Sequence, residues 1–223
     1  MERIQRTSTL QRTTAAVREA LLSGEIALGD RLTEEKLADQ LGVARATLRT
    51  ALHLLTQEGL IEQQPYCGWS AITLSAHDIW EIYTLRAELE GFALQTFLER
   101  RRVAPISQLS DLRDELEKAC ARGNLVAASA ADEKIHRSIV RLADHRRLLD
   151  QYDMMSAQIR MLIASSNELI SDSAEIFEQH EPIFEAIARG NARQARKVTE
   201  NHVRSEGEKL RLRVEAIERI KEV

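Results

Sequence analysis

The sequence predicts a mainly α fold, in which an N-terminal winged helix-turn-helix domain (residues 1–75) precedes an all-α antiparallel bundle of about six helices (residues 76–223). Three observations lead to this expectation. Leu, Ala, Glu, Arg and Gln dominate the 223 residues, with only nine glycines and three prolines, a composition that favours helices. Two short segments rich in β-forming residues follow the third helical segment. From Ser75 onward, apolar residues recur with helical spacing.

The first two helices are marked by their start and stop residues. An amphipathic segment covers about residues 10–23 and ends at Gly24, and the sequence LGDRL after it is expected to be a connector. Thr33 can cap the second helix, whose first turn contains two acids near the positive end of the helix dipole. That helix is expected to stop at Gly42, because glycine adopts the left-handed exit most easily.

The third helix is expected over about residues 44–58. Arg45, Arg49 and His53 are spaced by four and lie opposite its apolar stripe. The following sequence, LIEQQPYCGWSAITL, predicts a short strand, a turn beginning around Pro65, and a return strand. The apolar stripe consists of Leu48, Ala51, Leu52 and Leu55.

The remaining chain has the signals of a helical bundle. The sequence SAHD, with Ser75 three residues before an acid, predicts the start of its first helix. Gly123 and Gly190, each followed by asparagine, supply later stop-and-start signals, and Pro105 suits the first turn of a helix. Short loops between long helices predict antiparallel neighbours. The expected helices span residues 76–101, 105–122, 125–143, 146–169, 173–189 and 192–220.

Composition also narrows the location of the protein. No apolar run approaches the roughly 20 residues of a membrane-spanning helix, and the N-terminal segment lacks the apolar core of a signal peptide. We therefore expect a cytoplasmic protein with no membrane partner, in which Cys67 and Cys120 are free thiols. The net charge of −4 gives no hint of nucleic acid, so a DNA-binding function must rest on the position of the charges.

One stretch has the charge pattern of a DNA-binding helix. From Leu41 to Leu55 the chain contains two arginines, one histidine and no acid. Two short helices joined by a glycine-containing turn, with Arg45 and Arg49 on the second, fit a helix-turn-helix, and the hairpin after it makes the domain winged. A recognition helix enters the major groove, where arginine binds guanine edges or phosphate. The alternative is that both arginines belong to a solvated helix face.

Four possible metal ligands lie in the second half. Asp132 and His136 are four residues apart, hence on one helical face, and His180 and His202 lie on two later helices, each beside an apolar stripe. Buried polar groups need partners, and one divalent transition metal ion would bind all four. Zinc is the first choice, with nickel, manganese or iron as alternatives. Each histidine could instead be a satisfied core or surface residue.

Arg86 falls on the apolar stripe of the first bundle helix. A buried guanidinium pairs best with an anion that accepts two hydrogen bonds. That anion could be a bound carboxylate or an internal acid such as Glu90. Arg160 and Asn167, in the fourth bundle helix, are further candidates for lining an effector pocket.

The N-terminal part resembles a known family. The run GEIALGDRLTEEKLADQLGVARATLRTALHLLTQEGLIEQQPYCGW is similar to the winged-helix domain of GntR-type transcription regulators. The run LADQLGV, followed by Arg45 and Arg49, is its most specific portion. The resemblance implies that Arg45, Thr47 and Arg49 contact DNA and that Gly68 forms the tip of the wing near the minor groove.

The C-terminal part resembles the FCD ligand-binding domain of the same family over most of residues 76–205. The similar segments are LRAELEGFAL, DEKIHRSIVRLADHRRLL and EQHEPIFEAIARGNARQARKVTENHV. The resemblance implies that Arg86 faces the pocket and holds a carboxylate effector. It also implies, from the metal-containing members, that the ion is bound by Asp132, His136, His180 and His202.

Several residues depart from what the resemblance implies. Glu35 stands where the family usually has arginine, Ala44 stands where it has serine or threonine, and the wing has no arginine near its glycine. These losses remove contacts to DNA and imply weaker binding or an unusual operator. Pro182 lies two residues after His180 in a helical pattern, where it should kink or start the helix and could displace that ligand.

Together these features predict a regulator and not an enzyme. We expect a homodimer that reads an inverted repeat in double-stranded DNA. An organic-acid effector between the metal and Arg86 would shift the DNA-binding population, with relief of repression as the expected sign. Two alternatives stay open. One is a sensor in which the metal itself is the effector; the other is a metal-dependent hydrolase, for which no HExxH helix or other general base is evident.

Overall fold

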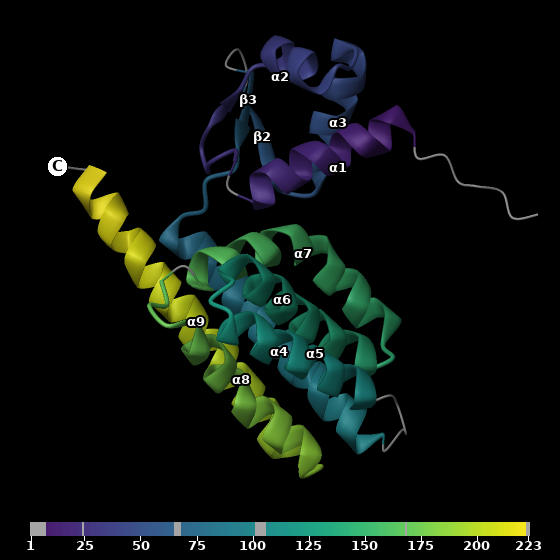
Figure 1. Cartoon of the computed structure of the whole chain (residues 1–223), viewed down its shortest axis with the longest axis vertical. Coiled ribbons are helices and arrows are strands. Elements are labelled where there is room, and N and C mark those ends of the chain that lie inside the picture. The colour runs from purple at the N-terminus through teal and green to yellow at the C-terminus, as the bar shows by residue number, and fades with distance from the viewer. Residues whose placement is uncertain (1–7, 24, 65–67, 101–105, 168, 222–223) are drawn as a thin grey trace, which may run out of the picture. The chain divides into compact units, whose positions relative to one another are not determined.

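The chain divides into two compact units, Met1–Leu74 and Ser75–Val223, in the computed structural model (Figure 1). Some expected features lie outside the described residues: the helix end at Gly24, the wing turn at 65–67 with one of the two cysteines, and the helix start at Pro105. The structure describes residues 8–23, 25–64, 68–100, 106–167 and 169–221.

The N-terminal unit combines three helices with a small sheet. Its elements, in chain order, are α1 (Thr9–Leu22), β1 (Arg31–Leu32), α2 (Glu34–Leu41), α3 (Arg45–Gln57), β2 (Ile61–Gln64) and β3 (Gly68–Ala71). The strands form an antiparallel sheet in the order β1-β3-β2. The apolar stripe expected on the third helix is confirmed, because all four of its members are fully buried. This stripe packs α3 against α1 and thereby turns its opposite face outward.

Strand β1 was not expected from the sequence. The segment LGDRL, expected to be a connector, contains Arg31 and Leu32, which pair with Ser70 and Trp69 of β3. The ladder is extended by the Ala71 N–H, which donates to the carbonyl of the residue before β1 at 2.8 Å. A strand of two residues is too short to show an alternation of apolar and polar side chains. Strand β1 can therefore be recognised only from its pairing with β3.

The corner between α2 and α3 is closed by Gly42. Its φ of 63° and ψ of 36° lie in the left-handed region, as expected for glycine at a helix exit. The N–H groups of Gly42 and Val43 donate to the carbonyls of Asp39 and Ala38. Thr33 occupies the N-cap of α2, but its side chain makes no capping hydrogen bond there, so the expected side-chain cap is wrong.

The secondary structure described in the C-terminal unit is entirely helical, which confirms the expected fold class. Ser75 begins it with the expected capping box: its hydroxyl accepts from the Asp78 N–H at 3.1 Å, and the Asp78 carboxylate accepts from the Ser75 N–H at 2.8 Å. Cys120 is a free, buried thiol. The helices are α4 (Ala76–Glu99), α5 (Ile106–Ala121), α6 (Leu125–Leu142), α7 (Arg146–Asn167), α8 (Ser173–Ala188) and α9 (Ala192–Lys221).

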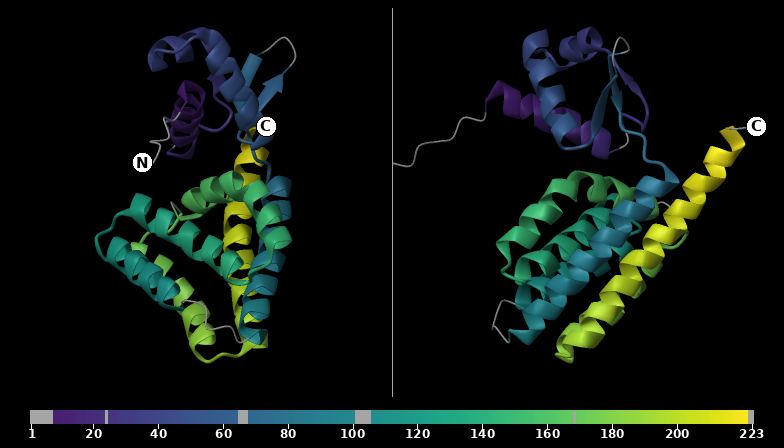
Figure 2. Two further views of the ribbon diagram at one scale, coloured as in Figure 1. Left: turned by 90° about the vertical axis from the view of Figure 1, so that its right-hand side faces the viewer. Right: turned by 180° about the vertical axis from the view of Figure 1, so that it is seen from behind.

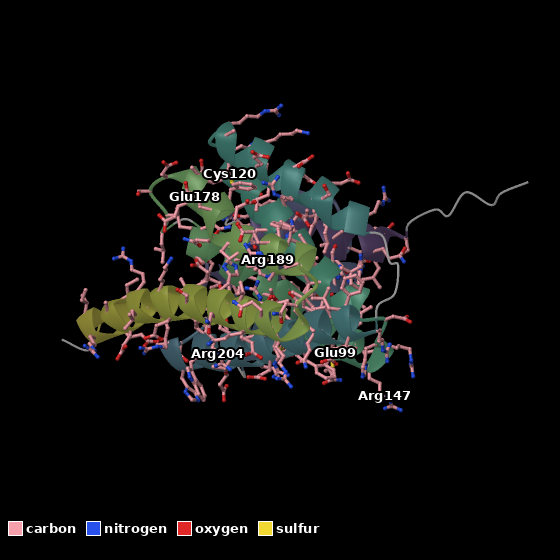
Figure 3. All side chains as sticks on the ribbon, turned by 90° about the horizontal axis from the view of Figure 1, so that it is seen from below. Glu99, Cys120, Arg147, Glu178, Arg189 and Arg204 are labelled. Atoms are coloured by element: carbon pink, nitrogen blue, oxygen red, sulfur yellow. The ribbon has the colours of Figure 1, made fainter. Side chains whose placement is uncertain are left out.

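Helices α4 and α9 run antiparallel and side by side (Figure 2). Near one end of the pair, the Ala76 N–H donates to the Glu218 carboxylate at 3.1 Å. Further along, the ring of Tyr83 lies directly against Gly207. Arg204, labelled in Figure 3, lies along the same seam and donates to a glutamate of α4 at 2.8 Å. The two helices are therefore fixed in one register.

Helix α6 packs against α4, α5 and α7 and contributes to the apolar core of this unit. Polar and charged side chains are buried in the same region as this core, among them Arg86, Glu90, Asp132, His136 and His180. Within the described residues, no helix is both long enough and apolar enough to cross a membrane.

Gly207 tests the close approach of α4 and α9. In a Gly207→Ala variant the added Cβ would lie 2.4 Å from Tyr83 Cγ, so the helices must separate or the ring must move. We expect the free energy of unfolding to fall by about 1–3 kcal/mol, measured by urea denaturation. Arg213→Ala, at an exposed position of the same helix, should change it by less than about 0.5 kcal/mol. Equal stability of the two variants would contradict this packing.

Candidate functional site

Arg45 and Arg49 project outward from consecutive turns of α3. The side chain of each is 60% exposed, on the face opposite the buried stripe. Between them Thr47 is half-buried. Gly68, at the start of β3, is exposed and has a φ of 90°, a conformation that favours glycine. The geometry of α3 therefore suits entry into a nucleic-acid groove.

Both arginines are paired with acids at the start of α2. The Arg49 guanidinium donates to the two carboxylate oxygens of Glu34 at 3.0 and 2.7 Å, and Arg45 forms an ion pair with Glu35. Glu34 also accepts a hydrogen bond from the Trp69 indole at 2.8 Å. The donors from Arg49 and Trp69 lower the pKa of Glu34. Glu34 thus links α2, α3 and β3.

A cluster of polar side chains converges inside the C-terminal unit. Asp132 Oδ1 lies 3.1 Å from His136 Nε2 and 3.4 Å from His180 Nε2. The two Nε2 atoms are 3.2 Å apart. Donor atoms of His136, His180 and His202 all lie within 4.8 Å of one another. Donor atoms about 2.0–2.2 Å from one ion are separated from each other by roughly 3.0–3.5 Å, so the first three atoms already have the spacing of a metal site.

The hydrogen bonds of the rings show why a cation fits. His180 Nδ1 lies 2.7 Å from the Ile176 carbonyl oxygen, which can only accept, so Nδ1 bears the hydrogen. His136 Nδ1 lies 2.6 Å from a Glu90 carboxylate oxygen, with the same consequence. In neutral rings both Nε2 lone pairs then point toward Asp132 Oδ1, a buried oxygen with no hydrogen-bond partner among the described residues. A divalent ion would satisfy all three atoms.

Asp132 is oriented by a second contact. Its other oxygen, Oδ2, accepts from Asn167 Nδ2 at 3.0 Å. Burial alone would raise the pKa of Asp132, but His180 and His136 hold it well below its ordinary value. The side chain is therefore an ionised carboxylate whose Oδ2 is held by Asn167. A cation bound at Oδ1 would replace the positive charge that the two imidazoles supply there in its absence, and would leave both rings neutral.

Glu90 lies at the centre of this polar network and is completely buried. Besides His136, it accepts from Arg86 Nε at 2.6 Å and from the Tyr152 hydroxyl at 3.0 Å. Burial would raise its pKa, but Arg86 and His136 hold the pKa at about 2. Sequence reasoning named Glu90 only as an internal partner for Arg86 and missed its contact with His136. The i, i+4 spacing of Arg86 and Glu90 was the available signal for the first contact; nothing in the sequence signalled the second.

Pro182 does not displace His180. Helix α8 continues through the proline, and His180 is buried with its Nε2 atom beside His136. The hydrogen bond from Nδ1 to Ile176, one turn earlier, holds the ring on the inner face of the helix. The displacement that Pro182 could have caused therefore does not occur.

A narrow cavity adjoins the cluster. Its volume, counted as space open to the centres of water molecules, is about 10 Å³, roughly room for one water. Asn167 lines it, whereas Arg160 is half-buried on α7 and is not among the lining residues. The polar residues that also line it are Tyr83, Arg86, Asp132, His136, Ser166, His202 and Glu206.

The sequence matches two family models. Residues 9–70 match the model described as bacterial regulatory proteins, gntR family, and residues 81–205 match the FCD domain. The chain is 25% identical over 196 residues to the HTH-type transcriptional regulator YdhC of Bacillus subtilis, covering 87% of this chain and 88% of that one. It is 27% identical over 178 residues to the gluconate operon transcriptional repressor of Bacillus licheniformis, covering 80% of this chain and 71% of that one.

The fold is similar to that of a crystal structure described as a GntR transcriptional regulator from Rhodococcus sp. RHA1. The TM-score is 0.80 at 20% sequence identity, and the match covers 92% of this chain and 98% of that one. At this identity the likeness concerns the fold alone.

The candidate metal site can be tested at Glu90, a change that leaves the four candidate ligands intact. Glu90→Gln removes a negative charge beside His136. In the wild type that charge orients the His136 ring and makes the ring more basic. We expect the affinity for Zn²⁺ to fall by about 10–100-fold, measured by competition with a chelator. Glu99→Gln, at an exposed position at the end of the same helix, is the matched control. Equal zinc affinities in the two variants would show that Glu90 plays no part in metal binding.

Proposed function

Since the chain belongs to the GntR family of bacterial regulatory proteins and has an FCD domain after its winged helix, we propose that it is a transcriptional repressor controlled by a small carboxylate. The carboxylate binds beside a divalent metal ion in the C-terminal unit. The observation on which this control rests is the convergence of Asp132 Oδ1 with two histidine Nε2 atoms, next to the cavity that Arg86 lines.

The DNA-binding part of the proposal is supported by the outward face of α3. Arg45 and Arg49 are exposed there, and their ion pairs with Glu35 and Glu34 can be exchanged for phosphate or guanine because exposed pairs contribute little stability. A homodimer would present two such helices to the two halves of an inverted repeat. Thr47 and Gly68 are the further residues that we assign to this interface.

The metal would be held by Asp132, His136, His180 and His202. When bound, it supplies positive charge and open coordination positions for an oxygen ligand. Zinc suits this set of three imidazoles and one carboxylate, and nickel, manganese or iron also fit. His202 is half-buried and is the only one of the four from α9.

The charge balance of the site favours an anionic effector. Arg86 and Glu90 neutralise each other, and Lys209 lies 2.9 Å from Glu206 and neutralises it. Asp132 neutralises one charge of a divalent ion, so one positive charge remains for a single carboxylate. Arg86 contacts Glu90 through Nε. The ion pair with Glu90 therefore does not use the N–H groups on Nη1 and Nη2 of Arg86. The cavity has room for about one water, so it must widen to admit the acid, and a short acid requires the least widening. A relative named for a gluconate operon supports an organic acid as the ligand class.

The acid would control DNA binding by binding unequally to two conformational states of the protein. The acid must bind one arrangement of the helical unit more tightly than another, and only that difference can change the affinity for DNA. We propose that the bound acid disfavours the DNA-binding state, so that it relieves repression.

The recognition helix is tested by opposite changes at its two ion pairs. Arg49→Ala should weaken binding to a specific operator by about 1–3 kcal/mol, measured by fluorescence anisotropy. Glu35→Gln should strengthen it by up to about 1 kcal/mol, because it frees Arg45 and removes a charge that phosphate repels. Glu25→Gln, an exposed change outside α3, is the control. Unchanged affinity in Arg49→Ala would remove that residue from the interface.

The effector is tested by titration of the protein–operator complex. With zinc-loaded protein, acetate or glycolate should release DNA, and zinc alone should not. In His136→Ala the metal content should fall and the response to the acids should disappear, since the ion no longer completes the site. Release of DNA by zinc alone, with no response to any acid, would instead establish the metal ion as the signal.

A further inference from the structure

Tyr83 has a buried hydroxyl group without a hydrogen-bond partner among the described residues. The side chain is 3% exposed and lies one turn before Arg86 on α4. The nearby Ser166 directs its own O–H to Glu206 at 3.1 Å, and its oxygen does not accept a hydrogen bond from the Tyr83 hydroxyl. Burial raises the pKa of Tyr83 well above its ordinary value, so the group remains a neutral hydrogen-bond donor.

A second buried tyrosine provides a direct comparison. The hydroxyl of Tyr152 donates to Glu90 at 3.0 Å, so this group is satisfied within the protein. An unsatisfied buried hydroxyl costs free energy comparable to a lost hydrogen bond, and such groups are rare in folded proteins. The hydroxyl of Tyr83 therefore requires an explanation that Tyr152 does not.

The position of the Tyr83 ring is fixed by its neighbours. Gly207 of α9 allows the ring to lie against that helix, since a Cβ there would be 2.4 Å from Tyr83 Cγ. The Arg86 guanidinium carbon lies 5.4 Å from the ring centroid. Tyr83 and Arg86 line the same cavity as Asp132 and His202. Two donors from one helix thus border the cavity that the metal ligands also line.

We propose that Tyr83 is a specificity-determining residue for the effector and that its hydroxyl donates a hydrogen bond to the same carboxylate that Arg86 binds. This inference rests on the proposed function. A carboxylate has enough lone pairs to accept from a guanidinium and a phenol together. Neutral ligands of the same size would leave the positive charge unbalanced, so the site selects short carboxylates over alcohols and amides.

The inference is tested with Tyr83→Phe in the full-length, zinc-loaded protein. Acetate and glycolate are the probes, at constant ionic strength, and affinity is measured by calorimetry. We expect Tyr83→Phe to bind them about tenfold or more weakly than the wild type, because a hydrogen bond to a charged group is lost. Zinc content should be unchanged. Without a probe, the melting temperature should be equal to or higher than that of the wild type, since an unsatisfied buried group has been removed.

Tyr152→Phe is the matched control. It should lower the melting temperature in the absence of a probe, because Glu90 loses a donor. A hydroxyl with a purely structural role at residue 83 would give the same loss in both variants, and that result would overturn the inference, as would equal probe affinity in Tyr83→Phe and wild type. If the wild type binds neither acid, the carboxylate part of the proposed function fails, and the role of Tyr83 fails with it.

Discussion

One buried carboxylate organises the polar centre of the C-terminal unit. Glu90 accepts hydrogen bonds from Arg86, His136 and Tyr152, which come from three different helices. A carboxylate in an apolar core is costly unless it is paired and hydrogen-bonded, and here all three partners stabilise its ionised form. In return Glu90 fixes the direction of the imidazole and of the guanidinium. His136 and Arg86, which we propose bind the metal ion and the effector, therefore depend on the same side chain.

The N-terminal unit uses the same pairing in a different solvent environment. Glu34 binds Arg49 and Trp69 much as Glu90 binds Arg86 and Tyr152. The Arg49 side chain is exposed, so its pair can be exchanged for a phosphate at little cost. The buried pair cannot be exchanged so easily, because separating it would leave an uncompensated charge. Arg49 can thus leave Glu34 at little cost, whereas Arg86 stays bound to Glu90.

Residues within one helix were predictable from sequence, whereas contacts between distant elements were not. Periodicity gave the helices and the stripe that contains Leu48, and the four-residue spacing placed Asp132 beside His136. Strand β1 is too short to show a pattern of its own. The link from Glu34 to Trp69 spans 35 positions and depends on how the sheet lies against α2. Arg160 and Asn167 lie on the same helix, α7. Only the packing of α7 shows that, of these two, Asn167 lines the cavity and Arg160 does not.

The hydrogen bond between Ala76 and Glu218 also constrains the order of folding. It joins residues 142 positions apart, and it connects the first helix of the C-terminal unit, α4, to α9. Contacts of such long range form slowly, because the intervening chain must first be ordered. During synthesis the N-terminal unit can fold as soon as it leaves the ribosome. The helical unit must wait for α9, so a nascent chain has a winged-helix fold before its C-terminal unit is complete.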